Sequence, residues 1–309
     1  MTPSKEQVTD FFSTLQDAIC SAMEKLDGGA IFSKDKWSRE GGGGGLTRAI
    51  VNGKVLEKGC VNFSAVSGKL PAMLVKELKL SAADAHEFFA TGVSIVMHPH
   101  NPMVPIIHMN VRYFEVMGPE NGNEEKICWF GGGIDLTPHY INKEDAEWFH
   151  TRLKKVCDLH HSGYYPDFKK WADDYFFIPH RNETRGVGGI FFDRMNEVPG
   201  IPLQNRFDFV KAVGNSFAPF YSHLVSKNKD LSYSENEKRW QFLRRGRYVE
   251  FNLVYDRGTR FGLETNGRTE SILLSMPPRA EWLYDHKPAP GSPEENTLVL
   301  LKKGINWAK

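Results

Sequence analysis

The chain has 309 residues, of which 40% are hydrophobic and 25% charged, as in ordinary soluble globular proteins. Lysine and arginine number 39 against 38 acids, so the overall charge favours neither nucleic acid nor a membrane surface as a partner. No apolar run approaches the ~18 residues of a membrane span, and no low-complexity linker divides the chain, so we expect residues 1–309 to form a single domain.

The four cysteines are widely spaced and form neither a CxxC pair nor a zinc pattern: Cys20, Cys60, Cys128 and Cys157. This usage is typical of reduced thiols in a cytosolic compartment. The first residues, MTPSKEQVTDFF, contain neither a basic, acid-poor leader nor an apolar signal core. The sequence therefore predicts a cytoplasmic location.

The first hundred residues are predicted to form helices, strands and a glycine-rich loop. Apolar residues recur at helical spacing over 8–26. The five glycines at 41–45 are not followed by the Gly-Lys-Ser/Thr of a phosphate loop, so a flexible lid or a close approach to a ligand is favoured over nucleotide binding. Alternation predicts strands at 61–66 and 92–97, and Ser81 is expected to cap a short helix that ends at Phe89.

The central stretch, residues 106–116, alternates as a β-strand should. Its polar face carries His108, Asn110 and Arg112. Asn121-Gly122 is a strong hairpin signal, so the following apolar run can pair back on this strand. A pivot midway between residues 121 and 122 places Asp135 opposite His108, next to three consecutive glycines.

An imidazole, an amide, a guanidinium and a carboxylate would thus converge beside Gly131–Gly133, where a flat ligand can approach the backbone. The alternative is that these residues are only the hydrated side of an antiparallel sheet. The combination favours a ligand site, because Arg112 lies mid-strand between bulky apolar neighbours and the facing strand ends in three glycines and an acid.

In the second half, capping residues and apolar periodicity predict helices over 142–157, 166–176, 206–225, 234–246 and 292–304. A strand is expected at 189–193, and three more over 247–276, joined by Arg257-Gly258 and Asn266-Gly267 turns. This last segment is rich in arginine: Arg244, Arg245, Arg247, Arg257, Arg260 and Arg268. Such a cluster indicates a polyanionic partner or an acid-lined interface, unless the arginines pair with the acids that lie near them in the sequence.

Long motifs along nearly the whole chain resemble the oxygen-dependent coproporphyrinogen III oxidases of haem biosynthesis. These motifs are GGGGLTR, HPHNPMVP, HMNVRYFE, WFGGGIDLTP, KKWADDYF, HRNETRGVGGIFFD, RRGRYVEFNLVYDRGT and GRTESILLSMPP. The resemblance implies a homodimer and an α+β fold, with a single domain whose large, mostly antiparallel sheet is flanked by helices on both faces. It also implies that two propionates of coproporphyrinogen III become vinyl groups, giving protoporphyrinogen IX, carbon dioxide and hydrogen peroxide.

The resemblance also implies roles for single residues. Substrate contacts match Ser94, Asn110, Val111, Arg112, Asn266, Gly267 and Arg268. His108 matches a proposed proton donor, and Asp135 a proposed base or pyrrole anchor. Some bacterial relatives are described with a metal at histidines that match His98, His108, His150 and His180, whereas eukaryotic relatives are described as metal-free. The sequence departs from the family's usual pattern at two of its site loops, with Asn266 in place of a frequent glycine and Arg194 in place of a common second acid after Asp193.

The residues suit this chemistry. The substrate has four central pyrrole N–H donors and peripheral carboxylates, so it needs an acceptor, which Asp135 offers, and cations, of which Arg112 is one. Because a porphyrinogen is electron-rich, polarising a pyrrole proton raises its reactivity toward oxygen. We therefore expect molecular oxygen as co-substrate and no required cofactor, with a divalent metal not favoured. The rivals are a non-catalytic tetrapyrrole carrier and a single-stranded RNA binder using residues 240–248, and the neutral net charge disfavours the latter.

Overall fold

A seven-stranded antiparallel sheet forms the centre of the computed structural model, which describes residues 2–80, 86–117, 127–264 and 267–309. Its strand order is β1-β2-β3-β4-β5-β6-β9. The strands are β1 (Ser33–Ser38), β2 (Gly43–Val51), β3 (Leu56–Lys69), β4 (Glu87–Pro99), β5 (Ile106–Met117), β6 (Ile127–Thr137) and β9 (Gly188–Met195). The predicted α+β class, with one large antiparallel sheet flanked by helices, is confirmed.

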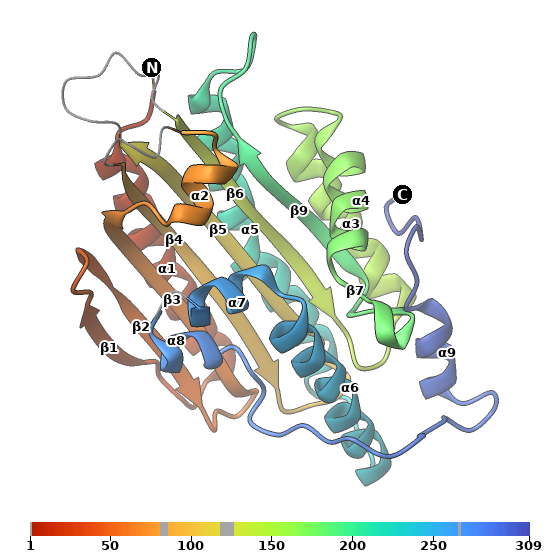
Figure 1. Cartoon of the computed structure of the whole chain (residues 1–309). Coiled ribbons are helices and arrows are strands. Elements are labelled where there is room, and N and C mark those ends of the chain that lie inside the picture. The colour runs from red at the N-terminus through yellow and green to blue at the C-terminus, as the bar shows by residue number, and fades with distance from the viewer. Residues whose placement is uncertain (1, 81–85, 118–126, 265–266) are drawn as a thin grey trace.

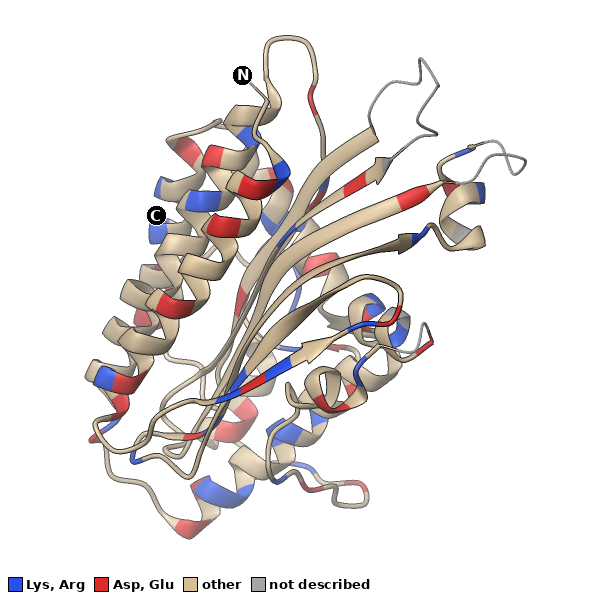
Figure 2. Ribbon diagram, turned by 90° about the vertical axis from the view of Figure 1, so that its left-hand side faces the viewer, with Lys and Arg blue, Asp and Glu red and all other residues tan. Residues whose placement is uncertain are grey.

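One face of the sheet, here called the core face, packs against long amphipathic helices (Figures 1 and 2). These are α1 (Lys5–Asp27), α3 (Lys143–Asp158) and α5 (Leu203–Asn228). Alternate residues of the central strands, such as Val93, Val111 and Ile134, are fully buried there. A Ser4 capping box starts α1, and Asn142 caps α3 as the sequence predicts.

The opposite face, here called the site face, is covered by three short helices and one long helix that lie in front of the sheet in Figure 1. They are α2 (Ala72–Glu77), α6 (Glu235–Val254), α7 (Arg257–Glu264) and α8 (Thr269–Leu273). Along the β9 edge lie α4 (Tyr164–Tyr175), the short pair β7 (Phe177–Ile178) and β8 (Glu183–Thr184), and the 3-10 turn η1 (Pro179–Arg181). Near the C-terminus is α9 (Pro293–Leu300).

Several sequence predictions are wrong. Of the five glycines at 41–45, only the first two lie in the connection between β1 and β2. Gly43 pairs with β3, and Gly44 and Gly45 pair with both β1 and β3, so these three are not part of a loop or lid. Residues 87–89 begin β4 and are not helical. The three strands expected over 247–276 are the last turns of α6 followed by α7 and α8. The proposed Ser81 cap and Asn121-Gly122 turn lie outside the described residues.

The two edges of the sheet differ. Strand β9 is lined by α4, whereas β1 is a six-residue edge strand whose side chains, including Lys34 and Lys36, are mostly exposed. Basic and acidic residues are interspersed along the outer helices (Figure 2), in keeping with the net charge of +1. Within the part of the chain that the structure describes, no helix is long and apolar enough to cross a membrane.

Candidate active site

The β5–β6 register matches the predicted hairpin geometry. His108 pairs with Asp135, Asn110 with Gly133 and Arg112 with Gly131. Residues directly opposite one another in an antiparallel pair share a face, so these groups all lie on the site face. The register, and not only the existence of the hairpin, was predictable from the spacing about residues 121 and 122.

The neighbouring strands extend this arrangement into two rows across the sheet. One row contains Asp35, Thr47, Asn62, Ser94, Asn110 and Gly133, and the other Trp37, Gly45, Ser64, Gly92, Arg112 and Gly131. Over β3 to β6 these rows carry mainly small side chains or none. They form a flat platform, the site floor, to which a planar or saucer-shaped ligand can come close.

Asp135 is the centre of a buried polar chain beside the site floor. Its Oδ1 accepts a hydrogen bond from His108 Nδ1 at 2.8 Å, and its Oδ2 accepts one from Arg185 Nη2 at 2.7 Å. The Asp135 side chain is 2% exposed, whereas that of His108 is 23% exposed. His108 is therefore the member of this chain that faces outward.

Charge fixes the tautomer of His108. Burial alone would raise the pKa of the Asp135 carboxyl, but the Arg185 guanidinium and the His108 ring together hold that pKa below its ordinary value. An ionised carboxylate can only accept, so Nδ1 of His108 must donate to it. In the neutral imidazole the lone pair then lies on Nε2, which is left to exchange protons with a ligand.

Arg185 belongs to the site, but the sequence did not identify it as a site residue. Its side chain is 1% exposed, and its guanidinium carbon lies 4.3 Å from the ring centre of Phe176, 4.7 Å from Tyr248 and 4.8 Å from Phe251. Its Nη1 also donates to Asn252 Oδ1 at 3.2 Å. Arg185 is thus a buried counterion for Asp135.

Arg112 lies at the open end of the site floor. Its Nη2 is 3.1 Å from Oδ1 of Asp193, and the two side chains are 39% and 29% exposed. A Cβ added at Gly131 would lie 2.5 Å from that same oxygen and 2.9 Å from Arg112 Nε. A side chain at residue 131 would therefore collide with the Arg112–Asp193 pair, so this position requires glycine.

The other residues expected to contact the substrate do not all present their side chains on the site floor. Ser94 pairs with Asn110 on the site floor. The Val111 side chain is buried on the core face, so only its backbone is available to a ligand on the site face. Arg268 forms an ion pair with Asp35 at the start of α8, and Gly267 donates its backbone N–H to Gly262. Asn266 lies outside the described residues.

Two amide oxygens on the site floor are buried yet have no hydrogen-bond partner among the described residues: Asn62 Oδ1 and Asn110 Oδ1. Asn62 uses its Nδ2 to donate to the Ser271 carbonyl of α8 at 3.0 Å. A buried acceptor without a donor costs roughly 1–3 kcal/mol. A ligand that offers N–H groups would satisfy both oxygens.

The four candidate metal histidines are engaged separately. His98 contacts the Ser275 carbonyl, His150 lies between Tyr165 and the Val187 carbonyl, and His180 lies between Tyr255 and Glu250. Among the described residues, no group of three or more His, Cys, Asp or Glu side chains is arranged to hold a metal ion. The structure therefore does not bring these four histidines together.

Five of the six clustered arginines form ion pairs. Arg247 and Arg260 pair with Glu250 and Glu264, which are close in sequence. The remaining three pair with distant acids, as Arg244–Glu183, Arg245–Glu57 and Arg268–Asp35. The cluster mainly ties α6 and α8 to the rest of the domain, so it does not by itself indicate a polyanionic partner.

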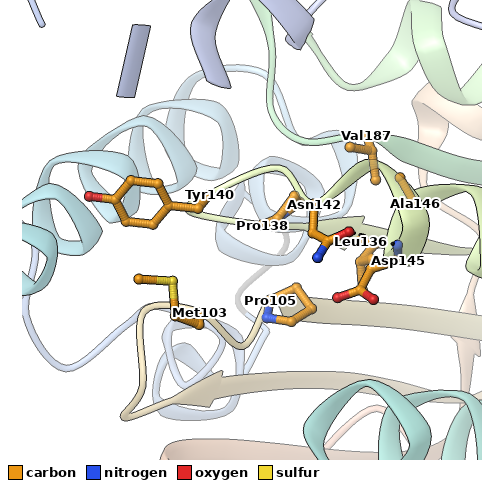
Figure 3. A pocket seen from close by; sticks show the side chains of 9 residues that line it. All are labelled: Met103, Pro105, Leu136, Pro138, Tyr140, Asn142, Asp145, Ala146 and Val187. Atoms are coloured by element: carbon orange, nitrogen blue, oxygen red, sulfur yellow. Dashed lines mark hydrogen bonds between the residues drawn. The ribbon is translucent and has the colours of Figure 1, made fainter. Parts of the chain in front are cut away.

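A small hollow lies at the far end of β6, lined by Met103, Pro105, Leu136, Pro138, Tyr140, Asn142, Asp145, Ala146 and Val187 (Figure 3). Its cavity volume is about 10 Å³, far below the ~300–1,000 Å³ usual for small-molecule sites. Its lining contains none of the residues on the site floor. We therefore place the active site on the site floor and not in this hollow.

Comparison with known proteins identifies the family of the chain. The sequence profile of the coproporphyrinogen III oxidase family matches residues 7–307. The chain is 50% identical to "Coproporphyrinogen-III oxidase 1, chloroplastic" of Arabidopsis thaliana and 51% identical to "Oxygen-dependent coproporphyrinogen-III oxidase, chloroplastic" of Glycine max. Each match spans 297 residues, which is 94% of this chain and 76% of the relative. The predicted cytoplasmic location is wrong by this comparison, because both relatives are chloroplastic enzymes.

Proposed function

Because the chain belongs to the coproporphyrinogen III oxidase family, we propose that it converts coproporphyrinogen III to protoporphyrinogen IX with molecular oxygen, in haem biosynthesis. Each step takes one propionate side chain and one O2 to one vinyl group, one CO2 and one H2O2. The propionate carbon skeleton is oxidised by two electrons as the C–C bond to the carboxylate breaks. Oxygen takes up those electrons together with two protons.

The observation that carries this proposal is the His108–Asp135–Arg185 chain at the edge of a floor that also presents Arg112. A proton-exchanging imidazole and a carboxylate-binding cation thus face the same ligand space. His108 Nε2 would exchange the proton, whereas Asp135 and Arg185 act as positioning residues that hold its tautomer and orientation.

The site floor suits the substrate's binding groups. The unpartnered oxygens of Asn110 and Asn62 can accept the pyrrole N–H groups, and Arg112 and Arg268 can take peripheral carboxylates. This assignment moves the direct pyrrole contact from Asp135, where the sequence predicts it, to the neighbouring amides. Both Asp135 oxygens already have donors within the protein.

The substrate itself supplies the electrons that reduce oxygen, so no flavin or haem is required for the chemistry proposed. A plastid location is proposed from the two chloroplastic relatives. We further propose that residues 1–309 act as one domain of a homodimer.

Aerobic incubation with coproporphyrinogen III, with and without a chelator, tests the activity. Separation of the tetrapyrroles should show protoporphyrinogen IX, recovered as its oxidised form, with two molecules of CO2 and two of H2O2 for each product. A non-catalytic carrier would return the substrate unchanged. Loss of turnover with the chelator, restored by one particular metal, would show that the reaction needs that metal.

Arg112→Ala should raise the Michaelis constant for coproporphyrinogen III by about tenfold or more. The variant removes a charge-assisted carboxylate contact that is worth roughly 1.5–3 kcal/mol in a partly shielded site. Steady-state kinetics would measure the effect, with Arg260→Ala as a control because Arg260 pairs with Glu264 on exposed α7. Unchanged KM and turnover in Arg112→Ala would exclude it from substrate binding.

The homodimer is expected to use the surface at the end of α6. Leu253 and Val254 at this helix end are 47% and 50% exposed. Apolar side chains grouped at a surface favour contact with another protein surface. Sedimentation at micromolar concentration should give a dimer that Leu253→Asp/Val254→Asp weakens, and a monomeric wild-type protein would contradict the proposal.

A further inference from the structure

A β-bulge at the end of β9 turns an unexpected cation toward the site floor. Phe130 pairs with Met195 and Gly132 with Phe192, so Asp193 and Arg194 together lie opposite the single residue Gly131. Simple alternation would send the side chain of Arg194 to the core face. Arg194 instead has φ +50°, a left-handed conformation that residues other than glycine adopt only when their surroundings impose it.

The bulge places Arg194 over an aromatic row of the site face. Its guanidinium carbon lies 5.4 Å from the ring centre of Trp129, which stacks on Phe114 at 4.6 Å, and Phe114 stacks in turn on Phe88 at 5.7 Å. Phe114 lies two residues beyond Arg112 on the same face of β5, a separation of about 7 Å along the strand. Arg112 and Arg194 thus border the same end of the site floor, and Asp193 forms an ion pair with Arg112 there.

Among the described residues, Arg194 forms one ion pair, and it is a weak one. Its Nη2 lies 2.6 Å from Glu77 Oε1 of α2, and these side chains are 47% and 52% exposed. Pairs this exposed contribute little and exchange readily for another carboxylate. By contrast, the ring of Trp129 keeps the guanidinium extended along the rim, which lowers the entropy lost when a ligand binds.

We propose that Arg194 binds a second carboxylate of the macrocycle whose first carboxylate is held by Arg112. This inference rests on the proposed function, because it takes the ligand to be a tetrapyrrole with several propionates. It also gives a role to residue 194, where the resemblance to the family predicts an acid and this chain has arginine. With arginine at 194, the group Arg112, Asp193 and Arg194 has a net charge of +1, whereas an acid at 194 would make it −1.

Direct binding of coproporphyrin III, the oxidised tetracarboxylate, tests the inference without turnover. Isothermal titration should show that Arg194→Gln weakens binding about three- to tenfold and Arg194→Asp more, with a shallower dependence on salt in both. In turnover of coproporphyrinogen III, Arg194→Gln should raise KM by a similar factor and leave kcat within about twofold.

Glu77→Gln is the matched control, because it breaks the Glu77–Arg194 pair but keeps the cation. We expect it to bind coproporphyrin III as well as wild type or more tightly. Equal weakening by Glu77→Gln and Arg194→Gln would mean that Arg194 only anchors α2, and wild-type binding by Arg194→Gln would also overturn the inference. If wild-type protein binds coproporphyrin III but does not turn over the porphyrinogen, the proposed function fails while the binding comparison still decides on Arg194.

Discussion

Asp135→Asn should lower turnover of coproporphyrinogen III by about 10²- to 10⁴-fold while substrate still binds. Arg185 would continue to donate to the amide oxygen, which leaves the amide N–H2 pointing at Nδ1 of His108. That nitrogen must then become an acceptor, so the ring proton moves to Nε2. The group facing the substrate would change from a proton acceptor to a donor.

Product formation under steady state, together with coproporphyrin III binding, would measure the effect of Asp135→Asn. Asp193→Asn is the matched control, because it neutralises another carboxylate of the site face that does not contact His108; we expect less than a tenfold change. If Asp135→Asn kept turnover within about threefold of wild type, the proton-exchange role of this chain would be excluded and the family assignment would stand.

Arg185→Met should destabilise the folded protein by about 3–5 kcal/mol, because it leaves the Asp135 carboxylate buried without its counterion. Methionine fills the space among the three aromatic rings but supplies no charge. Equilibrium denaturation in urea would measure the change in unfolding free energy. Arg260→Met, which breaks the exposed Arg260–Glu264 pair, should cost less than about 1 kcal/mol.

The double variant Asp135→Asn/Arg185→Met separates stability from activity. It removes both charges, so it should regain about 2 kcal/mol or more of the stability that Arg185→Met loses. Turnover should remain as low as in Asp135→Asn, because His108 still lacks an anionic partner. A double variant as unstable as Arg185→Met would show that the charges are not the source of the cost.

The sequence was most informative where local rules decide the structure. Strict alternation over 106–116, a Gly-containing turn and a glycine triplet sufficed to predict the His108–Asp135 pairing. The predicted helices α1, α3, α4 and α5 also formed, since their apolar stripes are local signals, to which α1 and α3 add a side-chain cap. Most of the buried side chains in each of these helices are apolar or aromatic.

The error over 247–276 has a physical cause. The buried face of α6 has helical spacing but consists of polar and aromatic side chains, among them Gln241, Arg245, Tyr248 and Asn252. An apolar-periodicity argument therefore passes over it and finds instead the alternation of Val249, Phe251 and Leu253. The interactions that stabilise the helix, such as the ion pair between Arg245 and Glu57, join residues far apart in the sequence.

Arg185 could not be assigned for a related reason. Its partner Asp135 lies 50 positions away, and the two meet because β9 pairs with β6 and places Gly189 opposite Asp135. The glycines before β9 were a usable signal for close backbone approach, but nothing local identified which carboxylate the arginine would neutralise. Ion pairs between distant segments require the strand order, which the sequence alone did not supply.

The exposed edge strand β1 bears on how the protein behaves at high concentration. An unpaired strand edge is a template to which another chain can add, and such addition begins aggregation. Here the edge is only six residues long and carries Lys34 and Lys36. An incoming strand would bring the same lysines from a second copy close to them, and this repulsion disfavours open-ended growth of the sheet beyond β1.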